Sequence, residues 1–342
     1  MSRSQQTAVA AQNTGGAIPP FTAGKNRIIN GDFGVWQRGT SFNGVNVAII
    51  YTADRWLIQC NFSSGTPTIT QQSFTPGTAP VTGYESAYFL QVANSSGSTD
   101  TQFQQRVEDV RTFAGQTVTL SFWAKATSSV TMSNLIIQNF GSGGSANVTN
   151  SSTQGAQTIG TSWARYSVTF NLASVSGKTI GTGSFLQVYP MYYNSGTIAS
   201  NTISIWGVQL ESGSVATPFT TATGTVQGEL AACQRYYQKS YSIAETTGGN
   251  GKINFNTPNR TDQYAIEFNA TFRISMRTAP TMTLYSPATN ASGYVRDEIS
   301  SADRAAITKN IGENSAQVEG NTGVTTTANA LHSFQWIASA EL

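Results

Sequence analysis

Two short stretches near the start of the chain carry most of the information about its fold: residues 30–42, NGDFGVWQRGTSF, and residues 51–56, YTADRW. Each places tryptophan, arginine and aspartate within a few residues, although charged residues make up only 11% of the chain. Aromatic rings fill β-sandwich cores, and a desolvated charge needs a partner of opposite sign. We interpret the set as a structural corner in which Asp54 pairs with Arg38 or Arg55, and keep open a platform for sugar stacking. The corner residues are Trp36, Arg38, Asp54, Arg55 and Trp56.

The composition indicates a globular protein with an uncharged polar surface. The 342 residues suffice for one to three domains, and the 11% of charged residues compares with a usual share of about 25%. The net charge is +2 without a basic run, so we expect no nucleic-acid surface. No apolar run approaches the roughly 18 residues of a membrane span, so we expect no membrane insertion. The N-terminus also lacks a hydrophobic signal region.

The sequence offers few metal-binding or disulfide-forming residues. It contains two cysteines, Cys60 and Cys233, and one histidine, His332. This is too little for a disulfide scaffold or a zinc site. We expect two free, buried thiols and no cofactor.

Short runs of alternating apolar and polar residues fill the region from Arg27 to Phe219. Period-two alternation predicts strands with one buried and one wet face. Many such runs between Gly-, Ser- and Asn-rich loops predict a sandwich or jelly roll, which we place at residues 26–220. The expected strands include residues 87–92, 117–124, 164–172, 184–189 and 202–210.

The remaining segments divide into three parts. Residues 1–25 form an arm, since Pro19 and Pro20 prevent a helix there; it either docks onto a larger assembly or is a tail. Residues 221–240 form a linker and a helix at 226–239, capped by Thr223 or Thr225. Residues 241–342 form a C-terminal β domain. Within it we expect a long strand at 264–276, a strand at 281–285, a helical turn at 301–307 and alternation at 334–342. The predicted fold is mainly β: a jelly-roll sandwich, a linking helix and a smaller C-terminal β domain.

Further motifs support a family resemblance. Residues 205–213 read IWGVQLESG, residues 215–219 VATPF and residues 230–237 LAACQRYY. Together with residues 30–42, and in this order, they resemble tail fibre and virion appendage proteins of tailed bacteriophages that carry a jelly-roll domain similar to carbohydrate-binding modules. The resemblance covers about two thirds of the chain and is weaker beyond Gln238.

The resemblance implies a structural virion protein, assembled in the host cytoplasm, that contributes to host attachment by non-catalytic binding. Such proteins are usually homotrimers, and the arm would contact other virion proteins. A host surface glycan is the expected ligand. The alternatives are a receptor-recognition module proper and a capsid-surface fibre or decoration protein. The resemblance also implies structural calcium at Asn30, Asp32 and Glu211, although Ile205 and Trp206 stand where an acidic pair would commonly help.

Two groups of aromatic residues are candidates for glycan contact. Trp123 shares a strand face with Thr119 and Ser121, opposite Leu120 and Phe122, so we expect it on an outer surface. The second group comprises Tyr189, Tyr192 and Tyr193. The alternatives for both groups are sheet packing and subunit contact.

Nothing in the sequence predicts catalysis. Glu108 and Asp109 lie between Arg106 and Arg111. Adjacent carboxylates on a strand or turn point apart, whereas glycoside hydrolysis needs two that face one bond at roughly 5–10 Å. We therefore expect a charged turn. The sequence also lacks the Gly-x-Ser-x-Gly motif, and we predict that the protein is not an enzyme.

Overall fold

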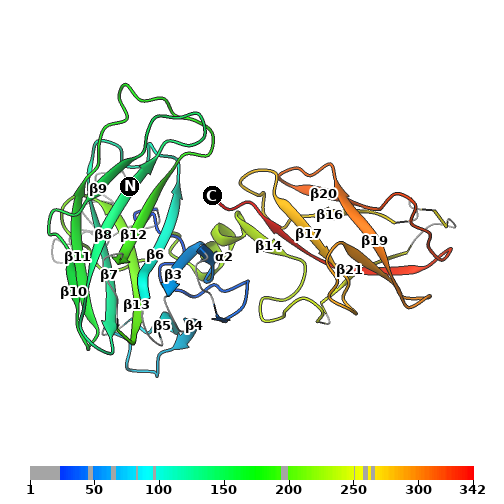
Figure 1. Cartoon of the computed structure of the whole chain (residues 1–342), viewed down its shortest axis with the longest axis horizontal. Coiled ribbons are helices and arrows are strands. Elements are labelled where there is room, and N and C mark those ends of the chain that lie inside the picture. The colour runs from blue at the N-terminus through cyan, green and yellow to red at the C-terminus, as the bar shows by residue number, and fades with distance from the viewer. Residues whose placement is uncertain are drawn as a thin grey trace, which may run out of the picture.

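The computed structural model describes residues 24–44, 49–62, 67–81, 84–94, 98–193, 199–249, 251–256, 261–262 and 266–342. The predicted arm lies outside these ranges except for its last two residues. The described parts form strands β1 to β21 in three antiparallel sheets, together with the helix α2 (Figure 1). The predicted class, mainly β with a sandwich, is confirmed. Figure 1 shows two lobes side by side, with α2 and the C-terminal end of the chain between them.

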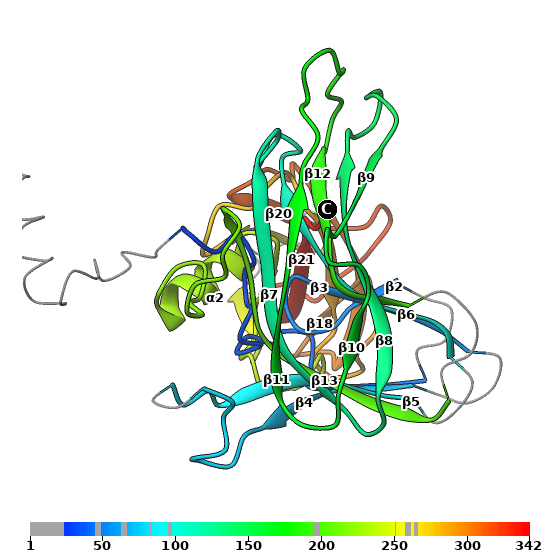
Figure 2. The ribbon, with the colours of Figure 1, turned by 90° about the vertical axis from the view of Figure 1, so that its left-hand side faces the viewer.

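Two sheets form the larger lobe, the sandwich. The six-stranded sheet has the order β1 (Ser41–Asn43), β4 (Thr68–Ser73), β5 (Tyr88–Asn94), β13 (Asn201–Ser212), β7 (Thr117–Ala126) and β11 (Ala164–Asn171). The seven-stranded sheet has the order β10 (Gln157–Ile159), β8 (Val130–Asn139), β12 (Phe185–Tyr193), β6 (Ser98–Glu108), β3 (Trp56–Phe62) and β2 (Ile49–Tyr51), with β9 (Val148–Ser151) paired to β8. Figure 2 shows α2 on one flank of the sandwich and β2 and β8 on the other.

The sandwich core follows from the alternation in the sequence. On β7, Leu120 and Phe122 are fully buried in the core that both sheets share. On the facing sheet, Phe103 of β6 and Val188 of β12 enter the same core. Burying large apolar side chains contributes about 1.5–3 kcal/mol each, so this face fixes the register of every strand. The five predicted strands in this region coincide with β5, β7, β11, β12 and β13 within a few residues.

The third sheet forms the smaller lobe. It contains β14 (Tyr237–Lys239), β21 (Leu331–Ser339), β18 (Tyr294–Asp297), β19 (Ala302–Lys309), β20 (Ser315–Gly320) and β16 (Glu267–Thr271), and β15 (Ile253–Asn256) and β17 (Thr281–Tyr285) pair with β21. Phe334 and Trp336 of β21 lie in a separate core cluster with Val318 of β20. The lobe thus has its own core, built around β21.

The linking helix is shorter than its sequence pattern predicts. Helix α2 spans Val226–Gln234, and Thr225 caps it by accepting from the backbone N–H of Gly228. The predicted continuation to residue 239 is wrong, because Tyr237–Lys239 forms β14 and pairs with Ile337–Ser339 of β21. The predicted boundary at 220 falls between the sandwich and α2, whereas β14 joins the third sheet before the predicted boundary at 240.

Two other predictions in the C-terminal lobe are corrected. Of the long strand expected at 264–276, the described residues form a strand only in β16. After β16, the N–H of Phe272 bonds to the carbonyl of Asn314. The helical turn expected at 301–307 belongs to β19, which pairs with both β18 and β20. The predicted strand at 281–285 is confirmed as β17. At 301–307, pairing with the neighbouring strands outweighs the local helical preference.

Candidate functional site

The outward face of the seven-stranded sheet gathers amide and tyrosine side chains. Because Phe103 of β6 points into the core, Gln102 and Gln104 lie on the opposite face. The register places Gln102 beside Gln59 of β3 and Tyr192 of β12. We call this surface the polar face. It comprises Gln59, Asp100, Gln102, Gln104, Arg106, Gln187, Tyr189 and Tyr192.

Hydrogen bonds hold the side chains of the polar face in place. The Asp100 carboxylate accepts from Gln59 Nε2 at 2.8 Å and from Gln102 Nε2 at 2.8 Å. Gln187 Nε2 donates to Gln104 Oε1. The Gln104 Nε2 donor is buried and has no hydrogen-bond partner among the described residues. The face thus has fixed amides, and the unpaired Gln104 donor lies beneath its surface, since Gln104 is fully buried.

Two tyrosines form the aromatic part of the polar face. The rings of Tyr189 and Tyr192 meet edge to face with centroids 5.4 Å apart. Burial raises the pKa of Tyr189 to about 12, and burial together with the Asp100 charge raises the pKa of Tyr192. Both hydroxyls are therefore neutral donors at physiological pH. Rings, amides and hydroxyls together suit a ligand rich in hydroxyl groups.

The four aromatic residues proposed for glycan contact do not share one surface. A β-bulge between Tyr189 and Tyr192 shifts the register, so that Tyr193 packs against the sandwich core while Tyr192 faces outward. Trp123 lies on β7 of the other sheet, opposite Trp206. Its expected position on an outer face holds, but there it packs into an aromatic cluster with Phe74, Phe89, Trp206 and Phe219. Only Tyr189 and Tyr192 belong to the polar face.

The residues of the predicted structural corner are buried or nearly so, and they form hydrogen bonds and ion pairs. The indole of Trp56 lies 4.9 Å from the Phe33 ring and donates to the carbonyl of Asn30 at 2.9 Å. Asp54 pairs with Arg38 at 3.5 Å, and Gln37 donates to the same carboxylate. Burial raises the pKa of Asp54, and the Arg38 charge opposes that rise. These side chains leave no free platform for a sugar.

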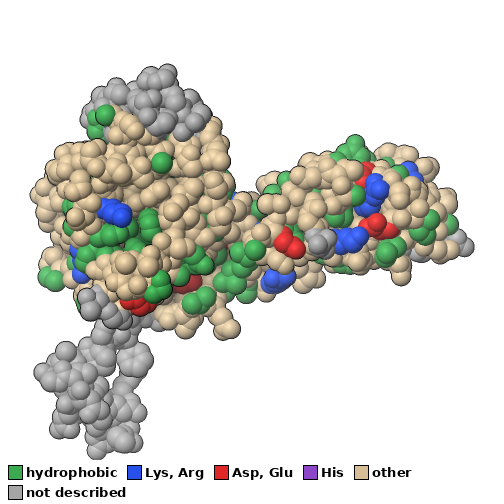
Figure 3. All heavy atoms as spheres, turned by 90° about the horizontal axis from the view of Figure 1, so that it is seen from below, with side chains coloured by type: hydrophobic (Ala, Val, Ile, Leu, Met, Phe, Trp, Pro, Cys, Tyr) green, Lys and Arg blue, Asp and Glu red, His purple; other side chains and the backbone are tan. Residues whose placement is uncertain are grey.

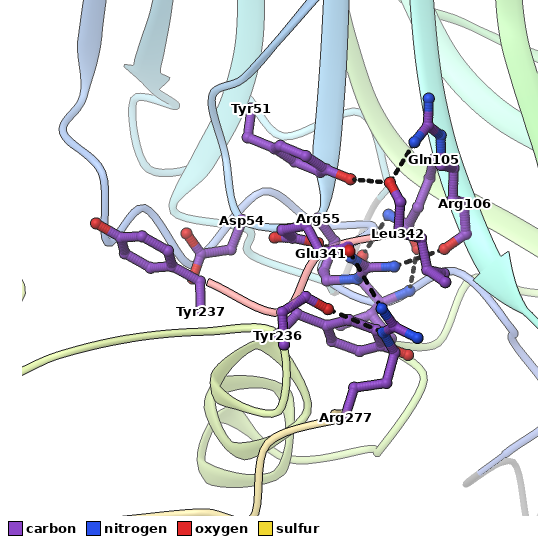
Figure 4. Close-up of polar contacts among 12 residues, drawn as sticks. Tyr51, Asp54, Arg55, Gln105, Arg106, Tyr236, Tyr237, Arg277, Glu341 and Leu342 are labelled. Carbon is purple, nitrogen blue, oxygen red and sulfur yellow. Dashed lines mark hydrogen bonds and ion pairs between the residues drawn. The ribbon is translucent and has the colours of Figure 1, made fainter. Parts of the chain in front are cut away.

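The corner also has a partner that sequence reasoning missed. Glu341, which follows β21, ion-pairs with Arg38 at 2.9 Å. It also ion-pairs with Arg55, which lies beside it in Figure 4. The guanidinium of Arg55 lies 3.5 Å from the ring centre of Tyr236, and that of Arg38 lies 3.7 Å from that of Tyr237. The corner therefore forms the junction between the sandwich, the end of α2 and the C-terminal lobe.

The three residues proposed as calcium ligands serve separate contacts. The Asn30 amide donates to the carbonyls of Val35 and Asp54 and accepts from the N–H of Val35. Asp32 accepts from the N–H of Gly34 at 3.4 Å, and Glu211 pairs with Lys25 at 3.0 Å. The described residues contain no group of three or more His, Cys, Asp or Glu side chains placed to hold a metal ion. Calcium binding by the three residues stays a prediction.

The other charged and sulfur-containing candidates have structural surroundings. Glu108 pairs with Arg235 at 3.2 Å, and Asp109 pairs with Arg111 at 3.2 Å in an exposed turn. The two carboxylates thus bind different cations, as expected for a charged turn. Cys60 and Cys233 are free and buried, which confirms that prediction. In the described part of the chain, no helix is both long and apolar enough to cross a membrane.

Comparisons with known proteins give fold-level likeness only. No protein-family model and no curated protein matches the chain. Among solved structures, a CBM4 carbohydrate-binding module is 18% identical with a TM-score of 0.31, covering 54% of this chain and 98% of the module. The N-terminal cellulose-binding domain of Cellulomonas fimi β-1,4-glucanase C is 22% identical with a TM-score of 0.29, covering 39% and 84%. The enzymatically active domain of bacteriophage CBA120 tailspike protein 4 is 16% identical with a TM-score of 0.31, covering 55% and 22%. At these TM-scores the likeness supports no argument about function.

Proposed function

We propose that this chain is a structural virion protein of a tailed phage, a tail fibre or fibre-like appendage that contributes to host attachment by binding a surface glycan without catalysis. The polar face carries the binding part of the proposal. The virion part rests on the sequence resemblance of residues 30–42, 205–219 and 230–237. The alternative is that the chain is a fibre or decoration protein on the capsid surface.

The polar face has the chemistry that a neutral glycan requires. Sugars present many hydroxyl groups, each of which donates and accepts, and side-chain amides do the same. Gln59 and Gln102 are held by Asp100, so a ligand would meet amides that are already oriented. Tyr192 is half-buried beside the more buried Tyr189. Because the two rings meet edge to face, the pair offers a ring edge and a ring face to an apolar sugar surface. Each contact is weak, and a homotrimer would multiply them through effective concentration.

The position of the family-like motifs supports this choice of surface. Trp36, Arg38 and Asp54, like Tyr236 and Tyr237, take part in the junction between the lobes. Their role in holding the lobes together accounts for the motifs without any ligand. A binding role is therefore better assigned to the polar face, although its Arg106 also donates to the carbonyl of Leu342 at the junction.

The test measures binding of fluorescent protein to host cells with and without competing host surface polysaccharide. Wild-type protein should bind and be competed. Tyr192→Ala and Gln187→Ala should each lower the affinity about tenfold or more. Tyr294→Ala, an exposed tyrosine on β18 of the other lobe, is the matched control and should bind normally.

Two results would contradict the proposal. Folded protein that binds no host glycan would remove the binding part, and unchanged binding by both variants would remove the polar face as its site. The virion part is tested separately by mass spectrometry of purified phage particles. Absence of the chain from intact particles would reject it.

A further inference from the structure

A hollow with aromatic walls lies on the sandwich away from the polar face. Two adjoining cavities of about 430 Å³ and 150 Å³ share the lining residues Asp32, Gly34, Tyr84 and Val226. They lie between the loop of residues 32–35, the segment of residues 84–88 and the first turn of α2. The larger cavity is in the size range of small-ligand sites, roughly 300–1,000 Å³. We call this feature the acidic groove, lined by Asp32, Tyr84, Glu85, Tyr88, Val226 and Glu229.

The aromatic wall is rigid, and the rim is apolar and exposed. The Tyr84 ring packs against Trp206 at 5.6 Å and Phe219 at 5.8 Å, so the aromatic cluster beneath it fixes its position. Tyr88 is 37% exposed and Val226 is 85% exposed. An apolar side chain so exposed at the mouth of a cavity gains nothing from folding, whereas a ligand would cover it.

The carboxylates of the groove have no cationic partner in the part of the chain that the structure describes. Glu229 is buried and accepts from neutral donors, the N–H of Asn30 at 2.7 Å and the N–H of Thr223 at 2.7 Å. The Asp32 carboxylate accepts from the backbone N–H of Gly34, and the Glu85 carboxylate accepts from that of Gly77. Among the described residues no Lys or Arg forms an ion pair with these three acids or lines the groove.

This concentration of negative charge contrasts with the rest of the surface. Only 17 residues of the chain are acidic, and Figure 3 shows few charged side chains on the face it draws. Several carboxylates elsewhere have cations, such as Arg235 beside Glu108 and Lys252 beside Glu298. Uncompensated carboxylates beside tyrosine rings attract a cation both by charge and by the ring quadrupole.

We propose that the acidic groove binds a sugar that bears a free ammonium group, such as a hexosamine unit without its acetyl group. This inference rests on the proposed glycan-binding function and adds a second subsite to it. The ammonium group would face Asp32 and Glu85, and the pyranose ring would lie against Tyr84 and Tyr88. The negative charge of the groove favours the ammonium group. The exposed tyrosine and valine favour a ligand with a carbon skeleton over a bare metal ion. Calcium, for example, needs six or more oxygen ligands.

The test compares two oligosaccharides that differ only in acetylation. Isothermal titration calorimetry at slightly acidic pH measures binding of chitosan tetrasaccharide, with free amines, and of chitin tetrasaccharide, with acetylated amines. The first should bind at least tenfold more tightly. Asp32→Asn and Glu85→Gln should each lower its affinity about five- to tenfold. Asp109→Asn, an exposed acid in a distant turn, is the matched control and should have no effect.

Three results would overturn the inference: no binding of chitosan, equal binding of both oligosaccharides, or full competition by millimolar calcium that also binds alone with Asp32-dependent affinity. The last would make the groove a metal site. The outcome is separable from that of the polar face, because Tyr192→Ala should leave chitosan binding intact. Circular dichroism of each variant checks that a loss reflects the groove and not misfolding.

Discussion

Glu341 accepts a hydrogen bond from Arg38 at 2.9 Å across 303 residues of sequence. The contact joins the segment after β21 to the corner of the sandwich. The same carboxylate pairs with Arg55, and the two arginines lie over Tyr236 and Tyr237. Three segments that look independent in the sequence thus form one buried network. The network is where the lobes are held together (Figure 4).

Removing the Glu341 charge should destabilise the junction. In Glu341→Gln, Arg55, with a side chain only 1% exposed, would keep its charge without a carboxylate. Breaking one side of a buried ion pair costs about 3–5 kcal/mol. We expect a loss of this order in guanidinium unfolding, with separation of the transitions of the two lobes. Glu267→Gln, at an exposed position of β16, is the control and should change the free energy of unfolding by under about 0.5 kcal/mol. A change just as small in Glu341→Gln would contradict a structural junction.

The corner loop also depends on one glycine. A Cβ at Gly31 would lie 2.2 Å from the carbonyl oxygen of Val208, and the N–H of Val208 bonds to the Gly31 carbonyl. Gly31→Ala must therefore move the loop away from β13, at a cost of at least about 2 kcal/mol. Gly34→Ala in the same loop meets no atom nearer than 3.5 Å and should cost little. Thermal denaturation of both variants checks this, and equal melting temperatures would refute the close approach.

The alternation of the sandwich strands made much of the fold predictable. In residues 117–124 every second residue is apolar, and these residues fill the core as β7. The C-terminal lobe gave a weaker pattern. The spacing of Leu230, Cys233 and Tyr237 fits a helix, yet Tyr237 begins β14 because β21 offers it a partner strand. The local spacing of apolar residues does not show which distant strands will pair. The sequence pattern therefore predicted neither the end of α2 at Gln234 nor a strand at β19.

The candidate sites show the same division. Tyr189 and Tyr192 stand out in the sequence as aromatic residues, but only Pro190 hints at the bulge that turns Tyr193 inward, because proline within a sheet occurs at bulges and edges. Glutamines such as Gln102 and Gln104 look like any solvent-facing strand residue until the sheet aligns them. Alternation alone would have placed both on one face of residues 98–108. The ion pairs of Glu341 with Arg38 and Arg55 arise only in the folded chain and could not be predicted from the sequence.

A buried aspartate in the C-terminal lobe makes its stability sensitive to acid. Burial alone would raise the pKa of Asp297, but hydrogen bonds from Ser300 and Thr327 outweigh it and hold the pKa well below its usual value. A lowered pKa in the folded state means stabilisation that is complete above the unfolded pKa of about 3.9 and is lost as the pH falls further.

Asp297→Asn should therefore lower the free energy of unfolding at pH 7, by about 1–3 kcal/mol for the lost charge-assisted bonds. The difference from wild type should shrink between pH 4 and pH 2.5, where the wild-type carboxylate is protonated on unfolding. Urea titrations of both proteins at pH 7, 4 and 2.5 measure it. A difference that stays constant over this range would mean that ionisation of Asp297 does not support the fold.

Both thiols should be inert while the protein is folded. Burial raises the pKa of Cys60 to about 12, and burial likewise raises the pKa of Cys233. Only the thiolate attacks a disulfide reagent, and both sulfurs are enclosed, Cys60 in the sandwich core and Cys233 in α2 beneath the junction. Native protein at pH 8 should thus react with Ellman's reagent far more slowly than a free thiol, and two thiols should react at once in guanidinium.

Because Cys233 lies in the helix that joins the lobes, Glu341→Gln should expose it first. The appearance of one fast-reacting thiol in that variant, assigned by mass spectrometry to Cys233, would tie thiol protection to the junction, and reaction of Cys60 first would place the weak point in the sandwich instead.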